Sequence, residues 1–288
     1  MLKKRGLIIP DNANSSHYLK HIGYYHLSAY MVSLQRGDRT SERHDFIEGT
    51  TLGDILSIYI FDRKLRLLIM DAVERIEIAV KSVIINEMCI PYGSHWYMNH
   101  EYFANKFGHR GFLETVQNDI NHGENSSRIR NISIRHYYEN YSSPSMPPLW
   151  MVFEALTFGK MSKIYTGLKH ADQKRIATAF EMPVPVLRSW LRSTSYIRNL
   201  CAHHSRVWNR VFTIKPLATS QFYSEEFTLN TKFYAQAVML NILMHRISPE
   251  TVWDDRLKSL FAEYPDIDKR KMGFPDDWEN RDVWKMRE

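Results

Sequence analysis

The residues best able to do chemistry lie together in residues 196–210, which read Tyr-Ile-Arg-Asn-Leu-Cys-Ala-His-His-Ser-Arg-Val-Trp-Asn-Arg. Asn199 directly follows Arg198, and His203 comes four residues after Asn199. Side chains four residues apart share one face of a helix, and the long Arg198 side chain can swing toward them. A guanidinium can grip a phosphate with two hydrogen bonds, and an imidazole can move a proton near neutral pH. These groups form a minimal set for cleaving RNA, whose own 2′-hydroxyl supplies the nucleophile.

The same stretch also has a structural interpretation. Apolar residues recur beside the polar ones and predict a helix that packs against the core: Ile197, Leu200, Val207 and Trp208. Arginine and histidine on such a helix usually form a solvated face. Residue types alone therefore leave both interpretations open for Arg198, Asn199 and His203.

Other polar residues of the stretch are secondary candidates. His204 is a candidate supporting residue, and Arg206, Asn209 and Arg210 are candidates for binding RNA because they follow the motif closely.

A zinc site is the main alternative chemistry for Cys201, His203 and His204. Structural zinc needs four ligands, usually in paired spacings, and the other cysteine, Cys89, stands alone. The sequence also has no glycine-rich phosphate loop, no G-x-S-x-G elbow and no H-E-x-x-H motif. We therefore expect neither a metal nor a cofactor.

Composition describes a globular protein with a modest positive charge. The 288 residues are 44% hydrophobic and 13% aromatic, with a net charge of +6 and a pI of about 9.1. This charge suits an anionic partner such as RNA, although many proteins are equally basic. Two cysteines in a chain of this length suggest a reducing compartment. No apolar run approaches the ~20 residues that span a bilayer, so we expect a cytoplasmic protein without membrane contact.

Hydrophobic periodicity predicts an all-α fold. The clearest pattern runs from Thr51 to about Met88, with a capping box at Thr51–Asp54, a break near Asp62 and an end at Pro91–Gly93. Further helices are expected over Ser15/Ser16–Gln35, Arg128–Tyr141, Trp150–Leu168 (opened by Pro148), Asp172–Phe180, Val186–Trp208, Thr228–Ile247 and Ser248–Ala262.

Three expectations concern the remaining segments. Residues 37–50 should form a loop and residues 121–127 a turn. The tail should be short turns packed by Phe274, Trp278 and Trp284. Tyr24, Tyr25 and Tyr30 could stack on bases, but their helical spacing favours core packing.

The motif also resembles a known family. Arg198 to His203 is similar to the R-x4-6-H signature of HEPN domains, in which a polar residue often follows the arginine. The longer run 196–210 resembles the Abi-like abortive-infection proteins (the AbiD/AbiF group) of bacterial phage defence. Other blocks resemble the same family in the same order: Ile22–Tyr30, Phe61–Arg66 with Glu74–Glu77, Trp150–Gly159 and Gly273–Trp278.

The resemblance implies a HEPN-like helical bundle with additional helices and loop insertions. We expect one domain over residues 1–288, without a confident internal boundary. Within it, residues 1–50 would be a helical extension, residues 51–247 the HEPN core, and residues 248–288 a final helix and tail.

The resemblance also implies a metal-independent endoribonuclease that acts as an abortive-infection or toxin-type effector. Arg198 would bind the scissile phosphate, and His203 would act as general base or acid. Asn199 would orient either His203 or the phosphate. HEPN sites can draw a polar residue from the first core helix, so Glu74 and Glu77 become supporting candidates. A solvated face with local ion pairs is the simpler explanation for this pair.

The same resemblance implies which molecules the protein binds. HEPN enzymes typically pair two motifs at a dimer interface, and this chain has one convincing copy, so a homodimer is implied. An RNA substrate and an antitoxin or regulatory RNA are the other expected partners. The alternative is a non-catalytic RNA- or protein-binding module of a defence or toxin–antitoxin system.

Overall fold

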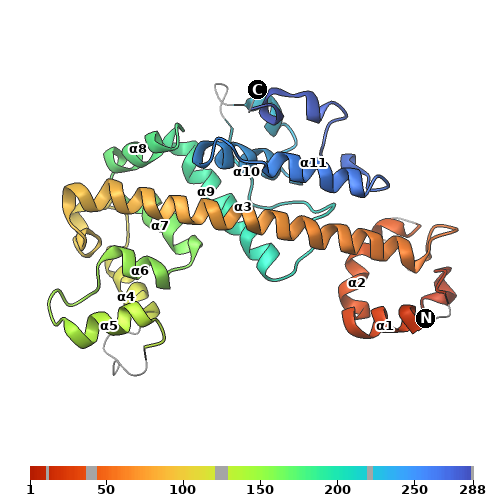
Figure 1. The fold of residues 1–288 in the computed structure, drawn as a ribbon, viewed down its shortest axis with the longest axis horizontal. Coiled ribbons are helices and arrows are strands. Elements are labelled where there is room, and N and C mark those ends of the chain that lie inside the picture. The colour runs from red at the N-terminus through yellow and green to blue at the C-terminus, as the bar shows by residue number, and fades with distance from the viewer. Residues whose placement is uncertain (11–12, 37–43, 121–128, 219–222, 287–288) are drawn as a thin grey trace.

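The computed structural model describes residues 1–10, 13–36, 44–120, 129–218 and 223–286. These ranges contain eleven α-helices, short 3-10 turns and isolated β-bridges, but no β-strand, which confirms the all-α prediction (Figure 1). The turn predicted at residues 121–127 and the first half of the predicted loop at 37–50 lie outside the described residues. In the described part of the chain, no helix is long and apolar enough to cross a membrane.

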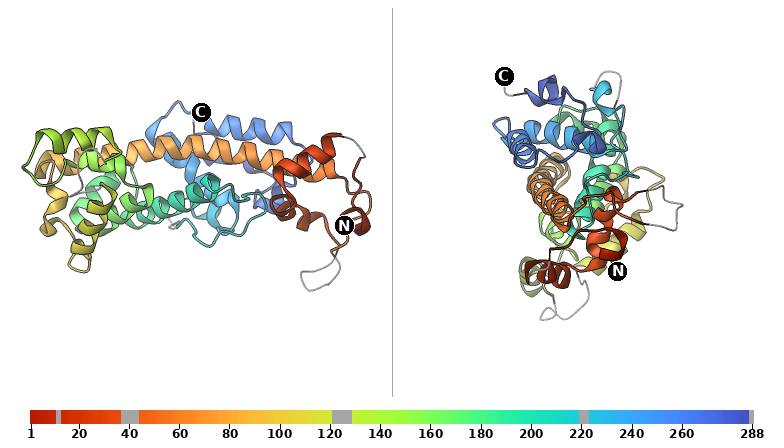
Figure 2. Two further views of the ribbon diagram at one scale, coloured as in Figure 1. Left: turned by 90° about the horizontal axis from the view of Figure 1, so that it is seen from below. Right: turned by 90° about the vertical axis from the view of Figure 1, so that its right-hand side faces the viewer.

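The longest helix, α3 (Leu52–Tyr92), is the axis of the molecule (Figure 2). Its 41 residues extend over about 60 Å at the usual helical rise. The predicted capping box is present, because the backbone N–H of Asp54 donates to Thr51 Oγ1 at 3.1 Å and that of Thr51 donates to Asp54 Oδ2 at 2.8 Å. The predicted break near Asp62 is wrong: α3 is continuous there, because this carboxylate bonds to groups outside the helix.

Three later helices pack along α3: α9 (Val184–Ala202), α10 (Phe233–Ile247) and α11 (Trp253–Glu263). The helix α10 is the centre of the core, since every residue from its start to His245 is buried. The indole N–H of Trp253 donates to the Leu68 carbonyl at 2.9 Å and so fixes α11 against α3.

One end of α3 is surrounded by short helices. In chain order they are α4 (His109–Asp119), α5 (Ile132–Asn140), α6 (Leu149–Ala155), α7 (Phe158–Gly167) and α8 (His170–Ala179). The single helix predicted over residues 150–168 is divided into α6 and α7, because Leu156 and Thr157 are extended. The Thr157 carbonyl then accepts from the backbone of Lys160 and Met161 and begins α7.

The opposite end of α3 contacts α2 (Tyr24–Met31), and α1 (Ala13–Ile22) packs against α2 (Figure 1). The single helix predicted here is divided at Gly23, whose φ of 84° suits glycine. Tyr30 is buried as predicted, but Tyr24 and Tyr25 are exposed.

Two helix starts also differ from the sequence predictions. The last long helix begins at Trp253 rather than at Ser248-Pro249, where the Ser248 carbonyl accepts from the Thr251 N–H and closes a turn instead. Likewise α10 begins at Phe233, after a 3-10 turn at Ser224–Phe227. The tail is confirmed as short turns packed by Phe274, Trp278 and Trp284, all of them buried.

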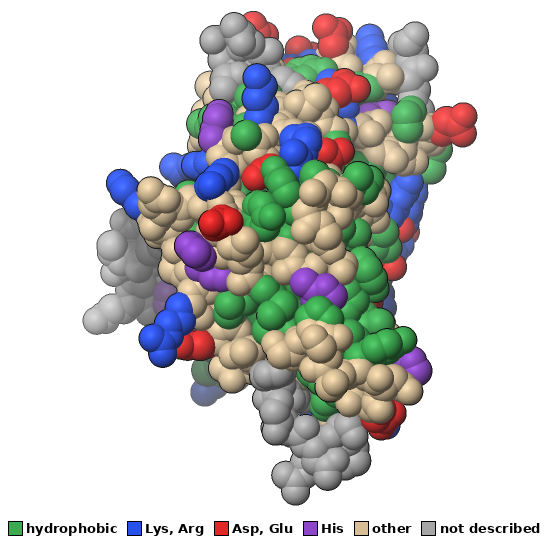
Figure 3. All heavy atoms as spheres, turned by 90° about the vertical axis from the view of Figure 1, so that its left-hand side faces the viewer, with side chains coloured by type: hydrophobic (Ala, Val, Ile, Leu, Met, Phe, Trp, Pro, Cys, Tyr) green, Lys and Arg blue, Asp and Glu red, His purple; other side chains and the backbone are tan. Residues whose placement is uncertain are grey.

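Figure 3 faces the end of the molecule that carries α4, α5 and α6, where hydrophobic side chains reach the surface beside Lys and Arg. Ile90 at the end of α3 and Ile132 at the start of α5 are 84% and 78% exposed. A second apolar pair, Leu67 and Ile78, lies further along α3, and each residue is 57% exposed. The surface therefore offers more than one apolar face for a partner.

Candidate functional site at the end of α9

The motif lies where α9 ends, so the predicted helix over 186–208 is too long. The chain leaves the helix through a Schellman motif: the His204 N–H donates to the Cys201 carbonyl at 3.0 Å, and the Ser205 N–H donates to the Leu200 carbonyl at 2.8 Å. This motif needs a left-handed residue, usually glycine, and here His204 takes that conformation with a φ of 55°. His203 is the helix-capping residue, at the first point where the chain can turn away.

This geometry makes a prediction about His204. A left-handed conformation costs an ordinary residue about 1 kcal/mol or more, whereas glycine adopts it freely. We therefore expect His204→Gly to raise the free energy of unfolding by up to about 1 kcal/mol, measured by urea denaturation. His204→Ala removes the same imidazole but keeps the strained backbone, so it should bring no such gain. A destabilised glycine variant would instead show that the His204 side chain stabilises the turn.

Arg198 and Asn199 are in contact, and His203 follows them as the residue that caps the end of α9. Arg198 Nη1 donates to Asn199 Oδ1 at 3.4 Å on the last turn of α9. His203 is exposed and is tied to Asn199 through the backbone, where its N–H donates to the Asn199 carbonyl at 3.0 Å. Within the described ranges the imidazole of His203 makes no hydrogen bond, so both ring nitrogens are open to a ligand.

Glu74 and Glu77 face the same groove as Arg198. This groove has a volume of about 520 Å³ and runs along α3. Arg198 is the residue of α9 that lines it. Glu77 pairs with Lys81 at 3.3 Å, the local ion pair that the helical spacing predicts. Glu74 is exposed and, among the described residues, has no ion pair. The structure therefore places both supporting candidates beside the arginine, although it shows no direct bond between them and Arg198.

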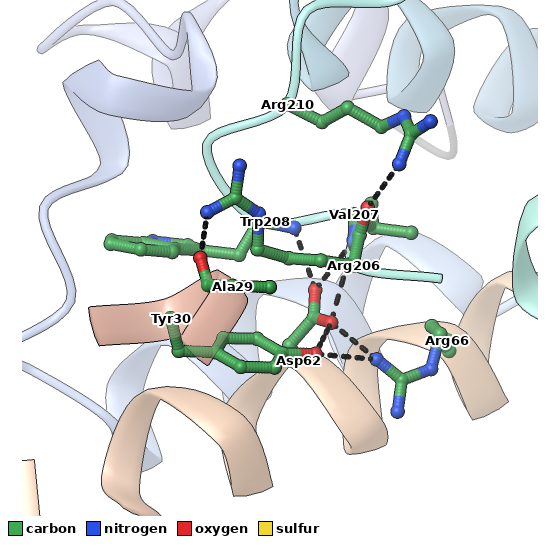
Figure 4. Close-up of polar contacts among 8 residues, drawn as sticks. All are labelled: Ala29, Tyr30, Asp62, Arg66, Arg206, Val207, Trp208 and Arg210. Atoms are coloured by element: carbon green, nitrogen blue, oxygen red, sulfur yellow. Dashed lines mark hydrogen bonds and ion pairs between the residues drawn. The ribbon is translucent and has the colours of Figure 1, made fainter. Parts of the chain in front are cut away.

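The turn after α9 is anchored by a residue that the sequence interpretation missed. Asp62, fully buried on α3, accepts from the backbone N–H of Val207 at 3.0 Å and from that of Trp208 at 2.6 Å (Figure 4). Tyr30 Oη donates to the same carboxylate at 2.6 Å, and Arg66 forms an ion pair with it. One carboxylate thus joins α2, α3 and the segment that follows the motif.

Burial and the neighbouring groups have opposite effects on the pKa of Asp62. Burial raises the pKa of Asp62, while Arg66 and the hydrogen bonds from Tyr30, Trp208 and Val207 act in the opposite direction. Burial, together with the neighbouring carboxylate, raises the pKa of Tyr30, which therefore stays neutral and donates its proton. The sequence signal that could have found the cluster is an Asp–Arg pair four residues apart on an otherwise apolar helix face.

Two of the three residues predicted to bind RNA also make structural contacts. The Arg206 guanidinium donates to the Ala29 carbonyl on α2, and Arg210 Nη1 donates to the Arg206 carbonyl at 3.2 Å (Figure 4). Asn209 has a φ of 47°, so it turns the chain. The two arginines therefore hold the turn in place, and the contact of all three residues with RNA stays a prediction.

Two titratable neighbours complete the site. Burial and the charges of Arg66 and His204 lower the pKa of His26 on α2, although the charge of Asp62 acts in the opposite direction. Burial raises the pKa of Cys201 to about 12, which keeps this thiol protonated at neutral pH. No group of three or more His, Cys, Asp or Glu residues that could hold a metal occurs in the described part of the chain.

A family model described as Abi-like protein matches residues 17–209, which is more than half of the chain and includes the motif, Asp62 and both glutamates. No curated protein and no solved structure matches the chain.

Proposed function

Because the chain belongs to the Abi-like protein family, we propose that it is an endoribonuclease of abortive infection that cuts RNA at the end of α9. The family description points to abortive infection, and the chemistry is inferred from the site. The observation that carries it is the arrangement of Arg198 and Asn199 in contact, with an unbonded His203 imidazole one helical turn further on.

In the proposed reaction, Arg198 binds the non-bridging oxygens of one phosphate and offsets the charge that develops on them. His203 accepts the proton of the adjacent 2′-hydroxyl, whose oxygen then bonds to phosphorus. The bond from phosphorus to the 5′-oxygen of the next nucleotide breaks, and that oxygen takes a proton. The products are a 2′,3′-cyclic phosphate and a 5′-hydroxyl. Glu74 and Glu77 would orient Arg198 across their shared groove.

The end chemistry of the products tests this proposal. We expect 2′,3′-cyclic phosphate and 5′-hydroxyl ends, an unchanged rate in EDTA, and resistance of RNA that carries a 2′-deoxy sugar at the cut position. The reason is that the nucleophile belongs to the substrate and needs no activation by a metal. Mass spectrometry of the cleavage products of a defined oligonucleotide identifies the chemical groups at their ends. Loss of activity in EDTA, restored by Mg²⁺ or Mn²⁺, would contradict the proposal, and RNA binding without cleavage would favour a non-catalytic module.

A homodimer is part of the proposal, because one imidazole cannot serve as base and acid at the same moment. A two-fold axis near α9 would place a second His203 at the leaving oxygen. The face that carries Arg198 has exposed apolar surface to support this contact, since Leu67 and Ile78 flank the same groove.

The dimer makes its own prediction. Light scattering should give about twice the 34.1 kDa of one chain. Adding an excess of His203→Ala protein to wild type should lower activity more than dilution does, because mixed dimers contain an incomplete site. Leu67→Glu should separate the subunits, and Ile132→Glu, at the far end of the molecule, is the matched control. A fully active monomer at the assay concentration would refute the dimer.

A further inference from the structure

A second, larger groove lies between α7 and α9, and it is strongly basic. Its volume is about 1220 Å³, above the ~300–1,000 Å³ of a typical small-molecule pocket. Among the described residues that line it there is no Asp or Glu. Its cationic residues are Lys106, Lys160, Lys163, Arg188, Arg192 and Lys215.

Most of this positive charge is not neutralised by the protein. Lys160 forms an ion pair with Asp119, and Arg188 donates to Gln173 Oε1 at 2.7 Å. The other four cations are exposed and have no ion pair within the described ranges. Uncompensated cations at this density in one groove repel each other, and an anion relieves this repulsion.

The groove leads directly to the motif. Arg188, Arg192, Ser195 and Asn199 line it from α9, and their spacings of four, three and four residues place them on one stripe of that helix. The stripe is about 16 Å long at the helical rise, and His203 follows Asn199 by four more residues. The close approach of α7 forms the floor, since a Cβ at Gly159 would lie 3.0 Å from Ser195 Oγ.

Two aromatic residues, Phe107 before α4 and Tyr196 on α9, also line this groove. Cations that follow a backbone, interleaved with aromatic rings, are the pattern of proteins that bind single strands, whose unpaired bases stack on the rings. A-form duplex offers no free base faces for such stacking.

We propose that the α7–α9 groove binds single-stranded RNA, with its phosphates on Lys163 and Arg192 and one end at Asn199 and His203. The inference rests on the proposed function for its choice of RNA. It adds the strand's path and the single-stranded form of the substrate.

Binding of an uncleavable strand tests the groove separately from catalysis. The probe is a short, fluorescein-labelled 2′-O-methyl oligoribonucleotide, and anisotropy is measured over a range of salt concentrations. Lys163→Gln/Arg192→Gln should weaken binding at least ~10-fold and reduce the slope of log affinity against log salt by about 1.4, or 0.7 for each lost phosphate contact. Lys20→Gln/Lys285→Gln is the matched control, since it removes the same charge from exposed residues outside the groove and should leave both values unchanged.

The outcomes separate the two proposals. Equal binding by the groove variant and wild type, or equal loss in the control pair, would overturn the groove assignment even if wild type cleaves RNA. Tighter binding to duplex RNA, or displacement of the probe by polyglutamate as readily as by unlabelled RNA, would overturn it as well. Groove-dependent binding of single strands by a protein that cuts none of them would retain the groove and refute the nuclease.

Discussion

His203→Ala and Arg198→Ala are each expected to lower RNA cleavage by at least ~10²-fold, the usual scale for a positioned acid–base group. The fold should hardly change, because His203 is exposed at the helix end and Arg198 bonds only to its neighbour Asn199 among the described residues. Initial rates on a defined oligonucleotide give the effect, and circular dichroism with urea denaturation checks the fold. Arg198→Lys keeps the charge but loses the bidentate grip, so its rate should fall between those of wild type and alanine.

The matched controls are His170→Ala and Arg130→Ala. Both positions are exposed, and neither lines the groove at α3 nor the groove between α7 and α9. Their rates should equal that of wild type. If the His203 and Arg198 variants are folded and cut RNA at the wild-type rate, the end of α9 is not the catalytic site.

The sequence predicted best where structure depends on local signals. The start of α3 was correct because the capping box at Thr51 and Asp54 is formed by neighbouring residues alone. The break near Asp62 was wrong because the donors that satisfy its carboxylate come from Tyr30, Val207 and Trp208, which are remote in the sequence. A buried aspartate looks like a helix breaker until these partners are known.

The end of α9 shows the same difficulty in a different form. A glycine directly after the helix would have indicated the turn in the sequence, but here His204 takes the left-handed conformation. The apolar residues Val207 and Trp208 also continue the hydrophobic pattern of the helix. Their side chains are buried because the turn returns to α3, not because the helix goes on.

The sequence could indicate the candidate motif but not the residues that surround it. Arg198, Asn199 and His203 are close in sequence, so a short motif could reveal them. The cations of the α7–α9 groove come from four separate segments of the chain, and no sequence window contains them together. The same holds for Asp62 and His26, whose positions near the motif depend on how α2 and α3 pack.

The second large effect is expected at Asp62. Asp62→Ala should lower the free energy of unfolding by about 3–5 kcal/mol, because it leaves the buried Arg66 without its counter-ion. It also removes the acceptor for the Val207 and Trp208 N–H groups. Tyr30→Phe removes the hydrogen bond that Tyr30 donates to this carboxylate and the one that it accepts from Arg66. Both partners are charged, so we expect a loss of about 1.5–3 kcal/mol. Urea denaturation at neutral pH measures both.

Asp62 has two roles, as counter-ion of Arg66 and as hydrogen-bond acceptor for Val207 and Trp208, and a double variant separates them. Asp62→Leu/Arg66→Met replaces the buried ion pair by apolar groups of similar size, a change that is often neutral by itself. Here we expect it to stay about 1–3 kcal/mol less stable than wild type, because the N–H groups of Val207 and Trp208 still lack an acceptor. RNA cleavage should fall with it, since the segment after His203 is then no longer held on α3. Full recovery of stability and cleavage in the double variant would show that Asp62 serves only to neutralise Arg66 and does not position the turn.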